Sequence, residues 1–306
     1  MFELIRPDTQ FDFVSKMKAA VIASVAFIAI GMASIVYHGG LNLGVDFAGG
    51  AVVQVQFQKE ATTDGLRTAL DGVQLENSTI QAFGTAENRE FLIRTPETAA
   101  DLKLLTDRID SALAKAFGAG TYEIRRVEAV GPKVGKDLSR KAILALALSW
   151  AAMLVYIAWR FEFRYAVGGI LALIHDVLVT VAVLSLLNME FTLNTVAALL
   201  TIIGFSINDT IVIYDRIREN VKKKIRADLR QIVNVSVNET LSRTILTSLT
   251  VFMVLLALLF LGGPVIFDFS FALFVGVVAG SYSTVFIASP FVLFMERFAP
   301  SKRKRK

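Results

Sequence analysis

Six long apolar segments alternate with polar connections along the chain. The first covers residues 19–37, contains no charged side chain and is long enough to cross the hydrocarbon core of a membrane. It exceeds the apolar part of a typical secretion signal, and no small-residue cleavage site follows it, so we interpret it as an uncleaved span. Five further spans are expected at 142–159, 165–187, 193–214, 244–261 and 269–295. The pattern predicts an α-helical polytopic membrane protein with six transmembrane helices.

Residues 38–140, between the first two spans, show shorter patterns. Apolar and polar residues alternate at 51–57, which predicts a strand. Further strands are expected at 79–83, 90–94 and 122–130, and helices at 63–70 and 96–117. The order strand, helix, strand, strand, helix, strand is typical of the ferredoxin-like split βαβ fold. We therefore expect a small ferredoxin-like α+β extracytoplasmic domain between helices 1 and 2.

The distribution of charge orients the spans. The net charge is +5, and basic side chains gather in the connection 216–243 and in the tail 296–306. Basic and non-basic connections alternate, as the positive-inside rule requires. We therefore expect the N-terminal segment 1–18, the loop and the tail in the cytoplasm, helices 2–6 within 141–295, and 38–140 on the other side. This asymmetry favours a membrane protein over a nucleic-acid-binding one.

Cysteine and histidine usage limits the chemistry. The chain has no cysteine and two histidines, which excludes disulfides and thiolate metal ligands and argues against a histidine-rich metal site. We expect no metal site.

Two spans carry carboxylates inside their apolar segments. Asp209, next to Asn208, precedes Arg216 by seven residues and so lies about 10 Å inside the cytoplasmic boundary. Asp176, next to His175, follows the preceding boundary by about 18 Å, near mid-membrane. Because a carboxylate is expensive in hydrocarbon, both mark candidate functional positions.

The start of the fifth span supplies a partner for Asp209. Arg243 belongs to a polar stripe at helical spacing and lies at the depth where it can meet Asp209 across an antiparallel helix pair. Such a pair would let a proton and an arginine compete for one carboxylate, which is the element of a proton relay. Plainer interpretations remain open: Arg243 extends to the headgroups, Asp209 is structural, and His175 with Asp176 forms an interhelical hydrogen-bond pair.

A glycine-rich motif, GVDFAGG at 44–50, joins the first span to the first strand. Gly44, Gly49 and Gly50 suit a tight junction where the chain leaves the membrane, and Asp46 is expected to cap that turn. We treat these four as a structural motif.

Several segments resemble the SecF family, the membrane subunits of the bacterial SecDF protein-export complex within the RND superfamily. They are the motif at 44–50, the His-Asp pair at 175–176, GFSINDTIVIYDRIREN at 204–220, NETLSRT at 238–244 and the Gly-Gly-Pro at 262–264. The resemblance covers nearly the whole chain and includes the order of its spans.

The resemblance implies a function and its residues. It implies a multi-pass protein of the bacterial inner membrane, with both termini cytoplasmic and the small domain periplasmic, that uses the proton-motive force to promote protein export. It places the relay at Asp209 and Arg243, with Asn208, His175 and Asp176 as candidate support and a further carboxylate supplied by SecD. Protons are the coupling ion, and no cofactor or enzymatic activity is expected. The implied partners are SecD, the SecYEG channel, YajC, YidC, unfolded exported polypeptides and membrane lipids, with no nucleic acid.

Two other functions are weighed against this one. An RND-type exporter of small molecules or lipids would be expected to carry a much larger outer domain. An intramembrane aspartyl protease would need Asp176 and Asp209 to share one site, but their expected depths differ, and Asp209 lacks the Gly-x-Gly-Asp context of such enzymes.

Overall fold

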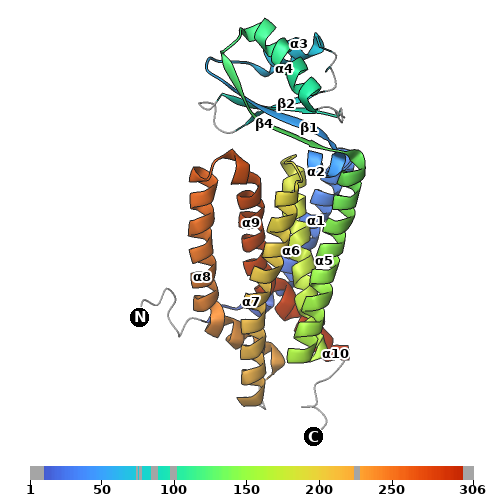
Figure 1. The fold of residues 1–306 in the computed structure, drawn as a ribbon. Coiled ribbons are helices and arrows are strands. Elements are labelled where there is room, and N and C mark those ends of the chain that lie inside the picture. Colours follow the sequence, from blue (N-terminus) through green and yellow to red (C-terminus); the bar gives the residue numbers. More distant parts are fainter. Residues whose placement is uncertain are drawn as a thin grey trace.

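The structure, a computed structural model, describes residues 10–73, 75, 78–83, 89–96, 102–223 and 228–298. Six of its helices are long and apolar enough to cross a membrane, and a four-stranded sheet is inserted between the first two (Figure 1). The six are α1 (Phe13–Tyr37), α5 (Pro132–Arg160), α6 (Phe163–Leu186), α7 (Leu193–Lys223), α8 (Leu229–Leu261) and a last one of three parts. Its parts are α9 (Pro264–Ser283), the π-helical turn η2 (Thr284–Ala288) and α10 (Ser289–Phe298). The predicted fold class is confirmed.

Several helices continue well beyond their apolar segments. Helix α7 extends past residue 214 to Lys223, and α8 begins at Leu229 rather than near residue 244. The described residues of the segment 216–243 are therefore helical except Asp228, which precedes α8, and residues 224–227 lie outside the described residues. Hydropathy marks where a helix meets hydrocarbon, whereas backbone hydrogen bonding continues into polar surroundings. The predicted terminal segments lie largely outside the described residues, because 1–9 and 299–306 are not described.

The bundle has an inner and an outer layer. About half of the spanning portions of α6, α7 and the last helix is buried, whereas α1, α5 and α8 expose most of theirs. Small residues let α7 and α9 approach closely. A Cβ atom added at Gly276 would lie 2.0 Å from Cδ1 of Ile202, and one at Gly280 would lie 3.0 Å from Cβ of Ser206. Close backbone approach through small residues is how membrane helices gain packing energy without a hydrophobic driving force.

The outer domain is ferredoxin-like. It contains β1 (Gly50–Phe57), α3 (Thr63–Asp71), β2 (Thr79–Phe83), β3 (Glu90–Thr95), α4 (Leu102–Phe117) and β4 (Tyr122–Val130). The strand order is β2-β3-β1-β4, and all neighbouring strands are antiparallel. Pro96, expected to begin the second helix, lies in a bend before it, and residues 97–101 lie outside the described residues.

One face of this sheet carries the domain core and the other faces the bundle. Helices α3 and α4 cover the face away from the bundle (Figure 1). Alternate residues of β1 and β3 pack there with leucines and isoleucines of the helices, and the buried set includes Val53, Val55, Phe57, Ile93, Leu105 and Ile109. The opposite face is polar, and on it Gln54 Nε2 donates to Glu90 Oε2 at 2.9 Å.

Candidate functional site

Asp209 lies buried on α7 with an incomplete set of hydrogen bonds. Its residue is 2% exposed. Thr247 Oγ1 on α8 lies 3.4 Å from Oδ1, and Oδ2 is buried without a hydrogen-bond partner among the described residues. The Thr247 hydroxyl has one proton to donate, and it also lies 3.1 Å from the carbonyl of Arg243 and 3.0 Å from that of Thr244. A buried carboxylate with so little support is costly unless it takes a proton or another partner.

Arg243 is the neighbouring cation, but it does not touch the carboxylate. It lies one turn before Thr247 on α8, its side chain is exposed, and its charge acts on Asp209. Among the described residues, no ion pair within 4.0 Å joins the two groups. The expected helix pair is therefore present, and α7 packs against α8, but the direct contact inferred from the sequence is absent from this state of the chain.

An open groove of about 910 Å³ lies beside this pair. It runs between the C-terminal half of α7 and the N-terminal half of α8 and includes the exposed Asn208 together with Arg243 in its lining. Asp209 itself faces inward, toward Thr247. The exposed cation and the buried anion thus lie on two sides of one helix–helix contact, and the cation faces open space.

Charged and polar side chains join the C-terminal end of α7 to the N-terminal part of α8. Arg216 Nε donates to Glu239 Oε2 at 2.7 Å, and Asn220 Nδ2 donates to the same oxygen at 2.6 Å. Asn220 Nδ2 also donates to Ser236 Oγ at 3.0 Å. In the sequence, Arg216 served only to mark the membrane boundary, and this contact was not predicted. The helical spacing of the polar residues Ser236 and Glu239 on α8 was the signal in the sequence that pointed to this contact.

Asp176 on α6 is buried with both carboxylate oxygens partnered. It is 0% exposed. His175 Nδ1 lies 3.1 Å from Oδ1, and Ser206 Oγ on α7 donates to Oδ2 at 2.6 Å. The His175 ring also stacks on that of Tyr282, with centroids 6.0 Å apart. The interhelical bond of this cluster runs to Ser206, one turn before Asp209, a partner that the sequence analysis did not name.

The two carboxylates do not form one site. Among the described residues, no hydrogen bond joins Asp176 to Asp209, and each has its own partners. A shared-proton dyad of the protease type needs direct contact between its carboxyl groups. In the described part of the chain, no group of three His, Asp or Glu side chains is placed to hold a metal ion.

The glycine motif forms a junction between the bundle and the outer domain. Residues Val45–Ala48 make a short helix, α2. Gly49 and Gly50 have positive φ values of 77° and 115°, which other residues rarely adopt. Asp46 does not cap its own turn as expected: its Oδ2 accepts from the backbone N–H of Leu193 at 2.9 Å, the first residue of α7.

The chain is similar in sequence to known proteins over most of its length. A family model described as the C-terminal part of the protein export membrane proteins SecD and SecF matches residues 110–298, and a SecD/SecF GG motif matches 36–61. The protein translocase subunit SecF of Magnetococcus marinus is 46% identical over 300 residues, covering 97% of this chain and 94% of its own length. The chain belongs to the SecF family. SecF of Calditerrivibrio nitroreducens is 43% identical over 306 residues, covering 99% and 98%.

Solved structures agree with this membership. The crystal structure of SecDF, a translocon-associated membrane protein from Thermus thermophilus, matches with a TM-score of 0.85 and 35% identity over 96% of this chain. SecDF in a super-membrane-facing form matches with a TM-score of 0.71 and 35% identity over all of it. This chain covers 40% and 41% of those two chains. Members of the SecF family act with SecD, and the six apolar helices indicate a multi-pass inner-membrane protein.

Proposed function

We propose that this SecF-family chain is the accessory subunit through which the proton-motive force promotes protein export by the Sec translocase. Its relay consists of Asp209 and Arg243, with Asn208 at the groove and the His175–Asp176 cluster as support. Its direct partner is SecD. Together they act beside the SecYEG channel on unfolded exported polypeptides, with YajC, YidC and membrane lipids as further partners. Both termini lie in the cytoplasm and the ferredoxin-like domain in the periplasm.

The observation that carries the proposal is the incomplete bonding of Asp209. The residue is buried, Oδ2 has no hydrogen-bond partner among the described residues, and the contact with Thr247 is 3.4 Å long. An ionised carboxylate in this place attracts Arg243, whereas a protonated carboxyl does not. Each protonation state therefore favours a different α7–α8 arrangement, which makes the pair a two-state element with a proton as its ligand.

The energy available suits such a cycle. One charge that crosses a membrane potential of about 100 mV releases about 2.3 kcal/mol. That amount exceeds the thermal energy about fourfold and is enough to bias two helix arrangements that differ by a few kilocalories. The exposed positions of Arg243 and Asn208 on the groove leave this face open to SecD, which would supply the further carboxylate of the relay.

Protein export into inverted membrane vesicles tests the proposal directly. With SecD co-expressed, Asp209→Asn is expected to lower the part of export that the proton-motive force stimulates at least tenfold. The ATP-driven part of export is expected to stay unchanged. Asp137→Asn is the matched control, because Asp137 is an exposed aspartate that pairs with Lys141 on α5, away from the relay. Proton stimulation that persists in Asp209→Asn at the control level contradicts the proposed relay.

The alternative functions receive no specific support. The described part of the outer domain is a small sheet with two helices, smaller than an exporter of drug-sized molecules was expected to carry. A protease is opposed by the separate partners of Asp176 and Asp209.

A further inference from the structure

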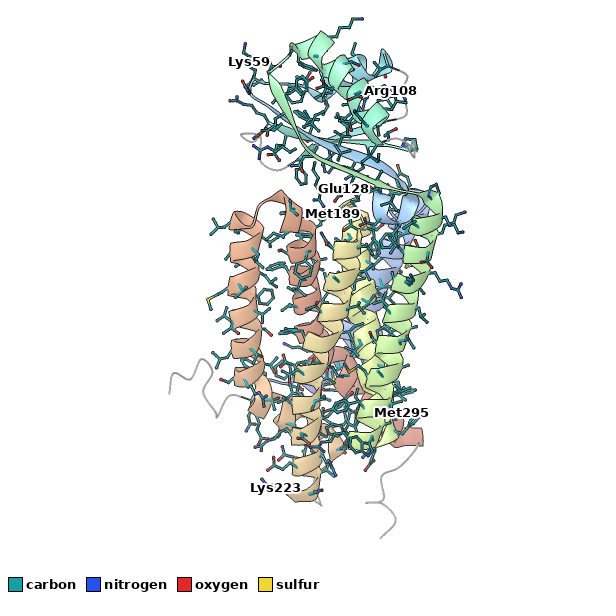
Figure 2. The ribbon with its side chains drawn as sticks, viewed as in Figure 1. Lys59, Arg108, Glu128, Met189, Lys223 and Met295 are labelled. Atoms are coloured by element: carbon teal, nitrogen blue, oxygen red, sulfur yellow. The ribbon has the colours of Figure 1, made fainter. Side chains whose placement is uncertain are left out.

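The connection between α6 and α7 is bonded to the segment that leads into the glycine motif. Phe191 N–H donates to the carbonyl of Asn42 at 2.7 Å, and Gly44 N–H donates back to the carbonyl of Phe191 at 2.9 Å. Asn42 Nδ2 donates to the carbonyl of Asn188 at 3.0 Å. Met189, in this connection, lies at the outer end of the bundle beneath the sheet (Figure 2). The outer end of α7 is therefore attached to the base of the outer domain.

Asp46 strengthens this attachment at the first residue of α7. Its carboxylate accepts from the N–H of Leu193, one of the N–H groups that a helix leaves without an internal partner. An anion is also favoured there by the helix dipole. Movement of α7 along its axis would therefore act on α2 through this bond.

Arg94 and Glu190 form a second attachment, this time to the sheet itself. Arg94 Nη2 donates to Glu190 Oε2, and the two side chains are only 15% and 13% exposed. Arg94 lies on β3, which is hydrogen-bonded on both sides, and it projects from the face opposite Ile93. Asp268, near the start of α9, adds a second negative charge that acts on Arg94.

The glycines make room for these contacts. A Cβ atom at Gly44 would lie 2.9 Å from Oε1 of Glu190, and one at Gly50 would lie 2.5 Å from the carbonyl oxygen of Thr95. A Cβ atom at Gly135, on α5, would lie 2.7 Å from the carbonyl oxygen of Phe47. The starts of β1 and α5, the end of β3 and helix α2 are thus packed together too closely to move independently.

We propose that Asp46, Arg94 and Glu190 are positioning residues that transmit movement of α7 to the outer domain. The proposal rests on the proposed function, because α7 is also the helix that carries Asp209. One uninterrupted helix separates Leu193 from Asp209, a distance of about 24 Å. The outer domain is then driven through the α6–α7 connection and not only through its covalent links to α1 and α5.

The charges around Glu190 give a way to release this contact. Burial is the main cause that raises the pKa of Glu190, and Asp268 and Asp46 raise it further, so the pKa is raised although the neighbouring Arg94 acts to lower it. Because the pKa in the folded chain is raised, Glu190 takes up a proton at a higher pH than a free glutamate does as the solution is acidified. Arg94 then loses its charged partner. Glu190→Gln reproduces that neutral state.

Export measurements test whether the contact matters. Arg94→Gln and Glu190→Gln are expected to lower proton-stimulated export at least threefold, whereas Arg94→Lys, which keeps the charge, retains most of it. Arg126→Gln is the matched control, because Arg126 pairs with Glu128 on β4 and is half exposed. Membrane levels of the chain and its co-purification with SecD are expected to match the parent. Equal export by Arg94→Gln and Arg126→Gln would overturn the proposal.

Spin labels test transmission itself. The chain has no cysteine, so Ser111→Cys on α4 and Leu261→Cys on α8, both exposed, place one label on the outer domain and one on the bundle. In the SecD complex, Asp209→Asn mimics the protonated relay and is expected to shift the distance distribution between the labels. Adding Glu190→Gln or Arg94→Gln is expected to abolish that shift.

The outcomes separate the two levels of the account. A shift that persists unchanged with Glu190→Gln and Arg94→Gln overturns the role of these residues and leaves the relay intact. If Asp209→Asn alone produces no shift, relay movement is not transmitted to the outer domain, and this proposal is overturned. If Asp209→Asn leaves proton-stimulated export unchanged, the proposed function is contradicted instead, even when Glu190→Gln or Arg94→Gln abolishes the shift.

Discussion

Asp176 and Asp209 are two buried carboxylates on neighbouring helices, and their surroundings differ sharply. Asp176 has a partner on each oxygen, at 3.1 Å from His175 and 2.6 Å from Ser206. Asp209 has one contact of 3.4 Å, to a hydroxyl that also faces two carbonyl groups, and an oxygen without a partner among the described residues. Burial alone therefore does not predict how completely a carboxylate is hydrogen-bonded.

We propose different tasks for the two groups on the basis of this difference. A fully partnered buried network stabilises one helix arrangement, because removing any member leaves the others unpaired. A poorly partnered carboxylate stabilises no arrangement strongly, and its protonation changes the local balance of charge. We interpret the Asp176 cluster as the contact that holds α6 on α7, and Asp209 as the group that changes state.

The largest expected effect on stability follows from removing Asp176. Asp176→Ala leaves the Ser206 hydroxyl and the His175 ring without their acceptor, so the free energy of unfolding should fall by about 3 kcal/mol. Asp209→Ala should change it by less than about 1 kcal/mol, since little bonding is lost. Equilibrium unfolding of the detergent-solubilised protein measures both. Equal losses for the two variants would remove the distinction between the two acids.

Ser206→Ala should make Asp176 resemble Asp209. It removes the 2.6 Å donor to Oδ2, and an unsatisfied buried acceptor costs about 2 kcal/mol of unfolding free energy. Ser149→Ala is the control, because Ser149 Oγ bonds only to the carbonyl of Ala145 on its own helix, among the contacts described. The same unfolding assay compares them. Indistinguishable values would mean that Ser206 does not support Asp176.

The smallest effect is expected for Thr247→Val, which removes the one described donor to Asp209. Valine has nearly the shape of threonine, and the lost contact is long, so the unfolding free energy should change by less than about 0.5 kcal/mol. The measurement is again equilibrium unfolding, beside Ser206→Ala. A loss as large as that of Ser206→Ala would show that Asp209 is held as firmly as Asp176.

The fold was largely predictable from the sequence because its signals are local. Apolar length predicts the six spans, and alternation predicts the strands of the outer domain. Helix ends were less predictable: the first turns of α8, beginning at Leu229, mix polar and apolar residues and so give no signal for a membrane span, although they pack on α7.

The candidate site was predictable only in part. Asp209, His175 and Asp176 stand out because they interrupt apolar segments, and Arg243 stands out because it belongs to the polar stripe that leads into the fifth span. Their partners did not, because Ser206 and Thr247 are ordinary residues of membrane helices whose roles depend on how α7 rotates against its neighbours. The capping of α7 by Asp46 joins residues 147 positions apart and likewise has no local sign.

The most direct test of the account is infrared difference spectroscopy of the purified SecD complex between neutral and acidic pH. Isotope labelling of aspartate identifies the carbonyl band of a newly protonated aspartic acid. The account predicts that this band disappears in Asp209→Asn and persists in Asp176→Asn. A band that survives Asp209→Asn and is lost in Asp176→Asn would contradict it.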